Sequence, residues 1–329
     1  MTTTDRVQEH EALYRARLAH VVPVREPLVL ISQIQRSGGT LLSQLFDGHP
    51  ECHAHPHELS IRYLNEPRRS AFDLGSADRS YEAVEERRLA KRLRSGYRKP
   101  AARPGDGDGD VFPFLLLPGL QRQIFDACFE TGVDSDRDVL DFYFTSFFNA
   151  WLDNQSLYAT PKKRVTAFAP RLVRKEAAVE RLFGAYPDGF LISIVREPRA
   201  WFASARLQKE RYADVDHAVT RWRWSAEAAL AARERYGDHA VVITYEDLVA
   251  RTAETMTRLA ERLGLSPSPT LLVPTFNGRP IRANSSYAVE GYGILSNRTD
   301  VYRDALDATT VARVDELAGD VYERACAAA

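Results

Sequence analysis

The sequence is poor in cysteine and carries almost no net charge. Its 329 residues include only three cysteines, Cys52, Cys128 and Cys326, which stand far apart. This spacing excludes a disulfide framework and paired zinc ligands, so we expect reduced thiols. Lys and Arg number 44 against 45 Asp and Glu, a net charge of −1. No overall basic field therefore points to nucleic acid or to an anionic membrane as a partner.

Long apolar runs are also missing. The first 20 residues, MTTTDRVQEHEALYRARLAH, are polar and lack the apolar centre of a secretory signal. No other run approaches the roughly 20 apolar residues that a membrane-spanning helix needs. We therefore expect a cytoplasmic protein without a transmembrane segment. A hydrophobic share of 44% and a charged share of 27% are ordinary for a globular protein.

Strand and helix patterns alternate along the chain. Apolar runs predict strands, and 3.6-residue periodicity predicts helices between and after them. This order indicates an α/β fold with a mostly parallel sheet and helices on both faces. No internal repeat is present, so we expect one domain over 1–329, with a core at about 28–300 and helical extensions at both ends. The expected strands are 28–34, 164–168, 189–195 and 240–248, and the main helices are 198–209, 217–236 and 252–263.

Two further segments have simpler interpretations. The aromatic stripe of 137–153 is more typical of a core helix than of a ligand box. Residues 81–99 are rich in Lys and Arg and indicate a helix with a solvated face. Gly and Asp predict a loop at 102–110. Trp222 and Trp224 are expected in the core or at an interface.

The strand at 28–34 runs into Gln35-Arg-Ser-Gly-Gly-Thr40, followed by a predicted helix to Gly48. A glycine-rich turn between a strand and a helix presents backbone N–H groups in a concave nest, and the helix dipole adds positive charge. Such a turn is suited to a phosphate. The nucleotide triphosphatase pattern G-x-x-x-x-G-K-[ST] is absent, since its first glycine and its lysine are missing.

A second cation stands at another strand end. In LISIVREPRAWFASAR, Arg196 precedes a proline that can start a helix, and Ser204 comes eight residues later. Two helical turns would bring Ser204 near Arg196, so both could bind one phosphate. The alternative for Arg196 is a surface ion pair with Glu197 or another acidic neighbour.

Together, QRSGGTLLSQLFDGHPE and ISIVREPRAWFASAR resemble the 5'-phosphosulfate and 3'-phosphate motifs of the sulfotransferases that use 3'-phosphoadenosine 5'-phosphosulfate (PAPS). VVITYEDLVARTAETMTRLAERLGL resembles their Y-E-D-L segment and the helix after it. The resemblance extends over about 28–300 and is strongest to the carbohydrate, bacterial and tyrosyl-protein members, which carry Arg in the first loop. It implies a three-layer α/β core related to that of the P-loop NTPases. It also implies transfer of a sulfuryl group to a hydroxyl, or less readily an amine, with no metal.

The resemblance also implies roles for individual residues. Arg36 would contact the oxygen that bridges phosphorus and sulfur, and Arg196 with Ser204 would bind the 3'-phosphate. Departures from the family are Gly39, Phe168 and Ala169, where hydroxyl, lysine and hydroxyl residues are usual; Arg171 could supply the missing charge. The implied donor-binding residues are Arg36, Ser37, Gly38, Gly39, Thr40, Leu41, Arg171, Arg196, Ser204, Arg282, Asn284 and Ser285.

The acceptor hydroxyl needs a base, and HPECHAHPHELS at 49–60 supplies candidates. Glu58 best matches the glutamate of tyrosyl-protein and several bacterial members, and His57 and His55 are rivals. The alternating His53, His55 and His57 could also bind zinc, although matched Cys or Asp ligands are missing. We expect this segment to be a loop that lines a cleft.

The acceptor and the assembly stay open. A carbohydrate, a glycolipid or a natural product would suit the resemblance, and a groove could be formed by 137–151, 100–120 or 86–98. Arg- and Ala-rich composition suggests a bacterial source, and a monomer and a homodimer are both open. Two other functions are weighed: a divergent P-loop kinase that binds ATP with Mg²⁺, and a non-catalytic nucleotide-binding protein.

Overall fold

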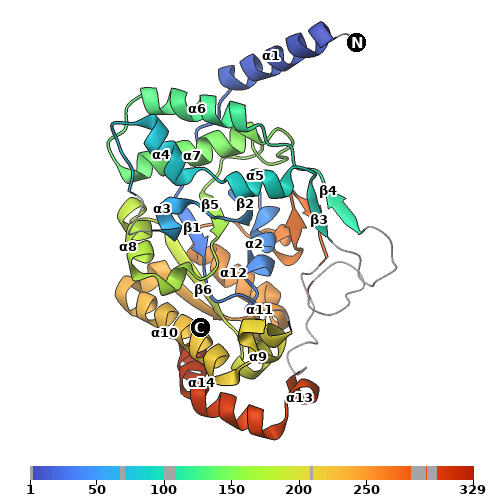
Figure 1. Cartoon of the computed structure of the whole chain (residues 1–329), viewed down its shortest axis with the longest axis vertical. Coiled ribbons are helices and arrows are strands. Elements are labelled where there is room, and N and C mark those ends of the chain that lie inside the picture. Colours follow the sequence, from blue (N-terminus) through green and yellow to red (C-terminus); the bar gives the residue numbers. More distant parts are fainter. Residues whose placement is uncertain (1–2, 67–70, 100–108, 208–209, 283–293, 295–301) are drawn as a thin grey trace. The chain divides into compact units, whose positions relative to one another are not determined.

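The computed structural model describes residues 3–66, 71–99, 109–207, 210–282, 294 and 302–329 (Figure 1). The chain divides into two compact units. Unit 1 comprises 1–26, 60–99 and 110–160, and unit 2 comprises 27–59, 100–109 and 161–329. The prediction of one domain over the whole chain stays a prediction.

Unit 2 contains a sheet of five parallel strands in the order β2-β5-β1-β6-β7. Its central strand β1 is fully buried and pairs with β5 on one side and with β6 on the other. This burial explains the continuous apolar runs in the sequence. The predicted α/β class and the predominantly parallel sheet are confirmed. The strands are β1 (Leu28–Ile31), β2 (Cys52–Glu58), β5 (Arg164–Phe168), β6 (Phe190–Val195) and β7 (Ala240–Thr244).

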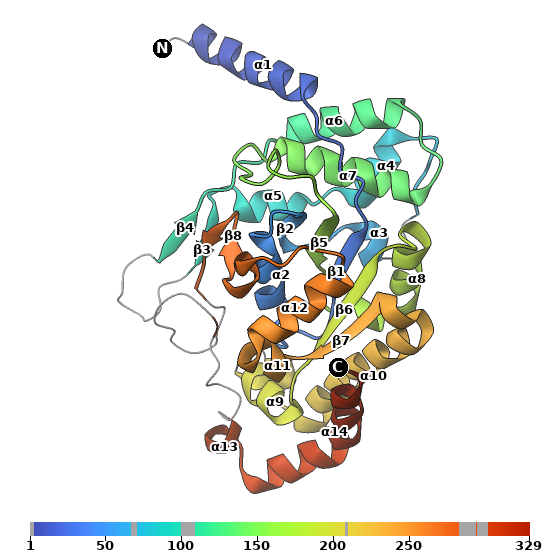
Figure 2. The same ribbon diagram turned by 180° about the vertical axis from the view of Figure 1, so that it is seen from behind.

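Helices cover both faces of this sheet. Val29 and Ile31 of β1 point to one face, where they join a core cluster with Phe46 of α2 (Gly39–Asp47) and Met256 of α12 (Thr252–Arg262). Figure 2 shows α2 and α12 in front of the sheet. On the other face, α10 (Val215–Tyr236) and α14 (Ala308–Ala328) pack on β7 and on each other. The three-layer arrangement follows from the alternation of side chains along the strands.

The remaining elements of unit 2 join or extend the sheet. A 3-10 turn after β5 leads into α8, and α9 follows β6 directly. The short hairpin β8–β9 is antiparallel. These elements are the 3-10 turns Leu172–Arg174, Glu210–Tyr212, Gly237–His239 and Pro269–Leu272, the helices α8 (Glu176–Ala185), α9 (Pro198–Arg206), α11 (Tyr245–Ala250) and α13 (Tyr302–Ala305), and the strands β8 (Thr275–Phe276) and β9 (Arg279–Pro280).

Unit 1 is mainly helical. Its aromatic helix α7 (Asp136–Ala150) begins with a capping box at Ser135 and is buried from Val139 to Ala150, which confirms the predicted core role. The other elements are α1 (Thr3–Ala19), α3 (Arg62–Asn65), α4 (Ala77–Val84), α5 (Arg87–Leu93), β3 (Tyr97–Lys99), β4 (Asp110–Phe112) and α6 (Pro118–Glu130). Among the described residues, no helix is both long and apolar enough to cross a membrane.

Several predicted segments differ in the structure. Within the expected loop 49–60, residues 52–58 form the edge strand β2, and the segment 81–99, expected to be helical, is the end of α4, then α5 and β3. The predicted strand 240–248 ends at Thr244, because the Thr244 side chain caps a helix that begins at Tyr245. Trp222 is buried as predicted, whereas Trp224 is 52% exposed. Most of the predicted loop 102–110 lies outside the described residues.

Candidate functional site

Four strand ends bring the predicted site residues to one edge of the sheet. The strands are parallel, so their carboxyl ends lie on the same side. β1 leads into the 35–40 loop, β6 into Arg196, β5 toward Arg171, and β2 ends at Glu58. All of these segments belong to unit 2.

The loop after β1 has an unusual backbone. Arg36 has a φ of 70° and Gly38 a φ of 97°, and α2 begins directly afterwards with a hydrogen bond of 3.0 Å from Leu42 N–H to the Gly38 carbonyl. A Cβ atom on Gly38 would lie 2.6 Å from the ring of Tyr245. Two features therefore favour glycine at position 38: the positive φ, which other residues rarely adopt, and the Tyr245 ring, which leaves no room for a side chain. Since no side chain among the described residues caps the start of α2, its first N–H groups are suited to an anion, as in a nest.

Gly39 explains two departures from the family at once. A Cβ atom there would lie 1.9 Å from Gln33 Nε2 and 2.5 Å from the ring of Phe168. Phe168, which stands where lysine is usual, thus lies in the space that a residue 39 side chain would need. The substitutions at 39 and 168 are two parts of one packing arrangement.

The structure brings together Arg36, Arg196 and Ser204. Arg36 Nε and Nη2 each donate to Ser204 Oγ at 3.4 Å, and Arg196 Nη1 donates to the Arg36 carbonyl at 3.0 Å. Glu197, the alternative partner of Arg196, pairs with Arg199 instead. Three residues singled out from two distant stretches of sequence therefore form one cationic centre.

Residues that the sequence did not single out hold Arg196 in place. Its guanidinium lies 4.6 Å from the Tyr245 ring centroid, a cation–π arrangement, and its carbonyl accepts from Trp222 Nε1 at 3.0 Å. The next residue, Glu197, donates its N–H to Glu246 at 3.2 Å. Burial raises the pKa of the Glu246 carboxyl. Tyr245 and Glu246 belong to the Y-E-D-L stretch, whose resemblance to the family was the sequence feature that could have pointed to them.

Polar atoms at this centre are suited to an anion. Ser37 Oγ and Arg196 Nε are buried and have no hydrogen-bond partner among the described residues. A buried donor without a partner costs about 1–3 kcal/mol. The oxygens of a phosphate or sulfate group would accept from both, so the residues present fit a phosphorylated donor.

Glu58 is the exposed end of β2. Its register with β5 shifts between Ala54 and Glu58, an irregularity that turns the end of a strand. The Glu58 N–H donates to His57 Nδ1 at 2.7 Å, and His55 Nδ1 bonds to the His57 carbonyl at 2.8 Å. His55 is only 1% exposed, which favours Glu58 and His57 over His55 as a base.

The zinc alternative for the histidines has no support in the described part of the chain. No group of three or more His, Cys, Asp or Glu side chains there could hold a metal ion. Burial lowers the pKa of His53 to about 3, so this imidazole is a neutral part of the core.

The remaining predicted donor-binding residues are placed only in part. Arg171 has a φ of 66° and donates its N–H to the Gln33 carbonyl at 2.8 Å. When the Gln35 amide is oriented so that its oxygen accepts, Arg171 Nε lies 2.9 Å from it. Arg282 follows the β8–β9 hairpin and is half-buried. Asn284 and Ser285 lie outside the described residues.

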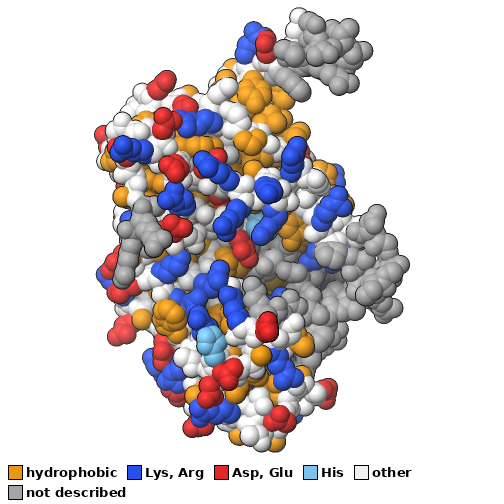
Figure 3. Space-filling view, viewed as in Figure 1, with side chains coloured by type: hydrophobic (Ala, Val, Ile, Leu, Met, Phe, Trp, Pro, Cys, Tyr) orange, Lys and Arg blue, Asp and Glu red, His pale blue; other side chains and the backbone are white. Residues whose placement is uncertain are grey.

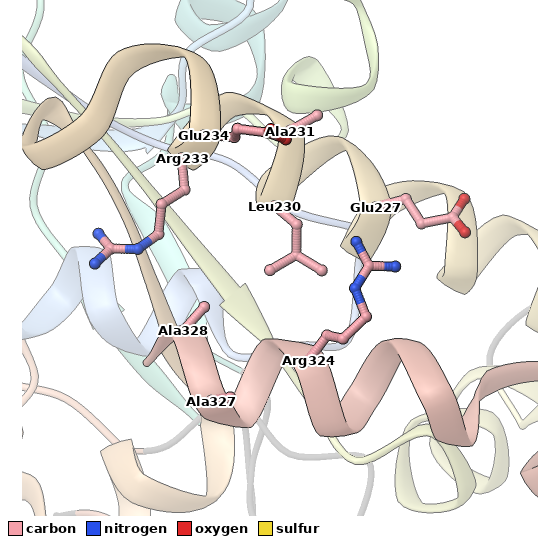
Figure 4. A pocket seen from close by; sticks show the side chains of 8 residues that line it. All are labelled: Glu227, Leu230, Ala231, Arg233, Glu234, Arg324, Ala327 and Ala328. Atoms are coloured by element: carbon pink, nitrogen blue, oxygen red, sulfur yellow. The ribbon is translucent and has the colours of Figure 1, made fainter.

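A hollow of about 450 Å³ lies between α10 and α14 (Figure 4). None of the predicted site residues lines it. The lining residues are Glu227, Leu230, Ala231, Arg233, Glu234, Arg324, Ala327 and Ala328.

Comparisons with known proteins agree with this geometry. Residues 27–269 match the sequence model of the sulfotransferase family. The fold is similar to the sulfotransferase domain from the curacin biosynthetic pathway, with a TM-score of 0.52, 17% identity and coverage of 88% of this chain and 96% of that chain. It is also similar to the sulfotransferase domain from the Synechococcus PCC 7002 olefin synthase, with a TM-score of 0.50, 19% identity and coverage of 90% and 96%. No curated relative matches the sequence.

The two structural neighbours share the α/β fold, and the family match covers most of the chain. The resemblance drawn from the two phosphate motifs is confirmed by a comparison that did not depend on them alone. The chain belongs to the sulfotransferase family and is a sulfotransferase enzyme.

Proposed function

We propose that this enzyme takes its sulfuryl group from PAPS. The observation that supports this donor best is the contact of Arg36 with Ser204 and of Arg196 with Arg36. It joins the loop suited to a 5'-phosphosulfate to the pair suited to a 3'-phosphate, the group that separates this donor from ATP. A divergent kinase is less well supported, because the loop lacks the lysine that follows the glycines in that class.

When bound, the donor supplies the sulfuryl group: the acceptor oxygen would attack its sulfur in line, the bond between sulfur and the oxygen of the 5'-phosphate would break, and adenosine 3',5'-bisphosphate would leave. The chain would contribute charge stabilisation, since Arg36 and the first N–H groups of α2 would face the oxygens that become negative. The half-buried Arg196 and buried Ser204 would fix the other end of the donor. Glu58, with His57 as its neighbour, would accept the proton of the acceptor hydroxyl. These steps parallel phosphoryl transfer, which depends on positioning and on charge stabilisation.

For the acceptor we propose a hydroxyl of a carbohydrate, a glycolipid or a natural product, with an amine as the less favoured nucleophile. We place the reaction in the cytoplasm of a bacterium, because the three cysteines are unpaired and reduced thiols suit that compartment.

The donor is tested by calorimetry with adenosine 3',5'-bisphosphate, beside ATP with Mg²⁺. We expect the bisphosphate to bind and Arg196→Ala to weaken it about 10- to 100-fold, because a charge-assisted contact to the 3'-phosphate is lost. Arg258→Ala, an exposed arginine of α12, is the matched control and should bind as the wild type does. Equal affinity for Mg-ATP, or no effect of Arg196→Ala, would overturn the assignment.

The base is tested separately. Glu58→Gln should keep bisphosphate affinity and lower turnover about 10²- to 10⁴-fold once an acceptor is in hand. Unchanged turnover in Glu58→Gln, with a loss in His57→Gln, would move the role to His57. Bisphosphate binding without transfer to any acceptor in a broad hydroxyl panel would instead support a non-catalytic binding protein.

A further inference from the structure

Four arginines gather beside the donor loop in unit 2. Arg171 and Arg174 follow β5, Arg211 lies in the 3-10 turn after α9, and Arg221 lies in the second turn of α10. We call Arg171, Arg174, Arg211 and Arg221 the arginine cluster. Arg174 has the other three as electrostatic neighbours. The face drawn in Figure 3 shows Lys and Arg side chains gathered beside a histidine, and Arg221 Nε bonds to His217 Nε2 at 2.9 Å.

Gln35 connects this cluster to the donor loop. Its side chain faces Arg171, as described above, and bonds to the Tyr212 hydroxyl at 3.4 Å. Arg211 lies over the ring of Tyr212, with 4.9 Å from guanidinium to centroid. The Gln35 carbonyl accepts from Trp201 Nε1 at 2.7 Å. Gln35, the residue before Arg36, therefore links the donor loop to Arg171 and Tyr212.

The four arginines of the cluster form no ion pair within the parts of the chain that the structure describes. Other arginines of unit 2 are paired, such as Arg223 with Asp320 at 2.7 Å and Arg313 with Asp216 at 2.7 Å. The nearby Asp214 instead caps α10 by accepting from the His217 N–H.

Arg174 is the member of the cluster whose charge is least well compensated. Its Nε and Nη1 atoms are buried and have no hydrogen-bond partner within the described parts of the chain. Burial, and then the charges of Arg171, Arg221 and Arg211, lower its pKa. Like charges held together without a counter-charge destabilise a protein unless an anion binds among them.

An exposed aromatic surface adjoins the cluster. The Arg174 guanidinium lies 4.9 Å from the ring centroid of Trp224, which is 52% exposed. Arg174 and Trp224 also line a hollow of about 390 Å³, a volume within the range of small-molecule sites. Two carboxylates line it as well, and both are paired with other arginines: Glu176 with Arg235, and Glu227 with Arg223. Such a surface suits a ligand that has an anionic group and an apolar or ring-shaped body.

We propose that the arginine cluster binds an anionic group of the acceptor: a phosphate, a sulfate or a carboxylate set apart from the hydroxyl that is modified. This inference rests on the proposed function and narrows its acceptor to an anionic substrate. The bound group would accept from Arg174, Arg211 and Arg221, and its body would lie against Trp224. Arg171 would then stand between the acceptor and the donor, through its contact with Gln35.

The test uses the full chain saturated with adenosine 3',5'-bisphosphate, so that the donor site is filled. Phenyl phosphate, phenyl sulfate and benzoate are titrated by calorimetry beside the neutral phenol. We expect at least one anion to bind more tightly than phenol, and Arg211→Gln and Arg221→Gln each to weaken it about tenfold. Arg258→Gln is the control and should have no effect. The three anions distinguish phosphate, sulfate and carboxylate recognition.

Three results would overturn the proposal. They are equal binding of phenol and the anions, an equal loss in Arg258→Gln, and anion binding that is seen in a parallel titration without the bisphosphate but not with it, which would assign the cluster to the donor. Failure of the bisphosphate itself to bind would refute the proposed donor instead. Arg211 is exposed and Arg221 is half-buried, so we expect both variants to fold. Their bisphosphate affinity checks this and should equal that of the wild type.

Discussion

Gly39 and Phe168 illustrate how single residues define this site. Each departs from the pattern of the family, and each lies where the other leaves room. The hydroxyl missing at 39 cannot be restored without moving the Phe168 ring or the Gln33 amide. The loop therefore depends on its backbone N–H groups, Ser37 and Thr40 for polar contacts.

Gly39→Ala should destabilise the protein by about 1–3 kcal/mol, because the new methyl group overpacks against Phe168. Urea unfolding measures this change. Phe168→Leu should reduce the cost of Gly39→Ala in a double-mutant cycle. Gly184→Ala is the control: a Cβ there meets nothing within 4 Å, so it should stabilise α8 by about 0.5–1 kcal/mol. Additive effects of the changes at 39 and 168 would contradict the packing described here.

The residues in and around the cationic centre differ in whether the sequence alone could single them out. Arg36, Arg196 and Ser204 stand in local motifs after strands, so their pattern sufficed. Gln35 acts through neighbours that are distant in sequence, and no local pattern reports such contacts. Tyr245 lies in the Y-E-D-L stretch, which resembles the family but does not show that the ring lies against Gly38 and Arg196. Of the arginine cluster only Arg171 was singled out, and Arg174, Arg211 and Arg221 were missed because the members come from three separate segments.

At the scale of elements, the turn from β6 into α9 positions the predicted 3'-phosphate pair. Glu197 caps α9 by accepting from the Ala200 N–H at 2.7 Å, while its own N–H donates to Glu246. The residue before it is Arg196, and Ser204 lies two turns into the same helix. The geometry of the pair therefore depends on how α9 begins.

Glu197→Ala should cost about 0.5–2 kcal/mol of stability through the lost cap and should also weaken bisphosphate binding several-fold. Urea unfolding and calorimetry measure the two effects. Asp307→Ala removes the comparable cap of α14, so it should lower stability by a similar amount and leave the affinity unchanged. An affinity loss in Asp307→Ala, or none in Glu197→Ala, would refute the link between this cap and the site.

Element type was predicted well for strands that are apolar and buried along their whole length, and poorly for β2, whose sequence is polar and whose end is exposed. β1, β5, β6 and β7 are apolar runs and were recognised. β2 was not, since His53, His55 and Pro56 conceal a strand that pairs with β5 on one side only. The strand predicted at 240–248 was too long, because Thr244 looks like any β-branched residue until its hydroxyl caps α11.

For the whole molecule, two groups indicate sensitivity to acid. Hydrogen bonds from Lys163, then Ser266, lower the pKa of Glu51 to about 2, and burial lowers that of His53 to about 3. Both values lie below those of an unfolded chain, so the unfolded state binds protons first as the pH falls. The folded state therefore loses stability as the pH falls. His53 contributes to this loss of stability below about pH 6.5, and Glu51 contributes below about pH 4.3.

The urea midpoint should therefore decrease from pH 7 to pH 4. Between pH 6 and pH 4.5, the slope of the free energy of unfolding against pH should be smaller in His53→Gln than in the wild type. The difference should be up to about 1.4 kcal/mol per pH unit, which corresponds to one proton. Glu51→Gln should alter the acid end only and lower stability at pH 7. The same slope in His53→Gln and in the wild type would exclude a buried neutral imidazole at this position.

The contact between Arg36 and Ser204 has a consequence for inheritance. The two residues are 168 positions apart in the chain, yet Arg36 donates to Ser204, and Arg196 donates to the carbonyl of Arg36. A substitution at Arg36 or Ser204 therefore removes a contact of the other residue. We therefore expect the two motifs to change together in evolution, so that a substitution in one is accompanied by a substitution in the other.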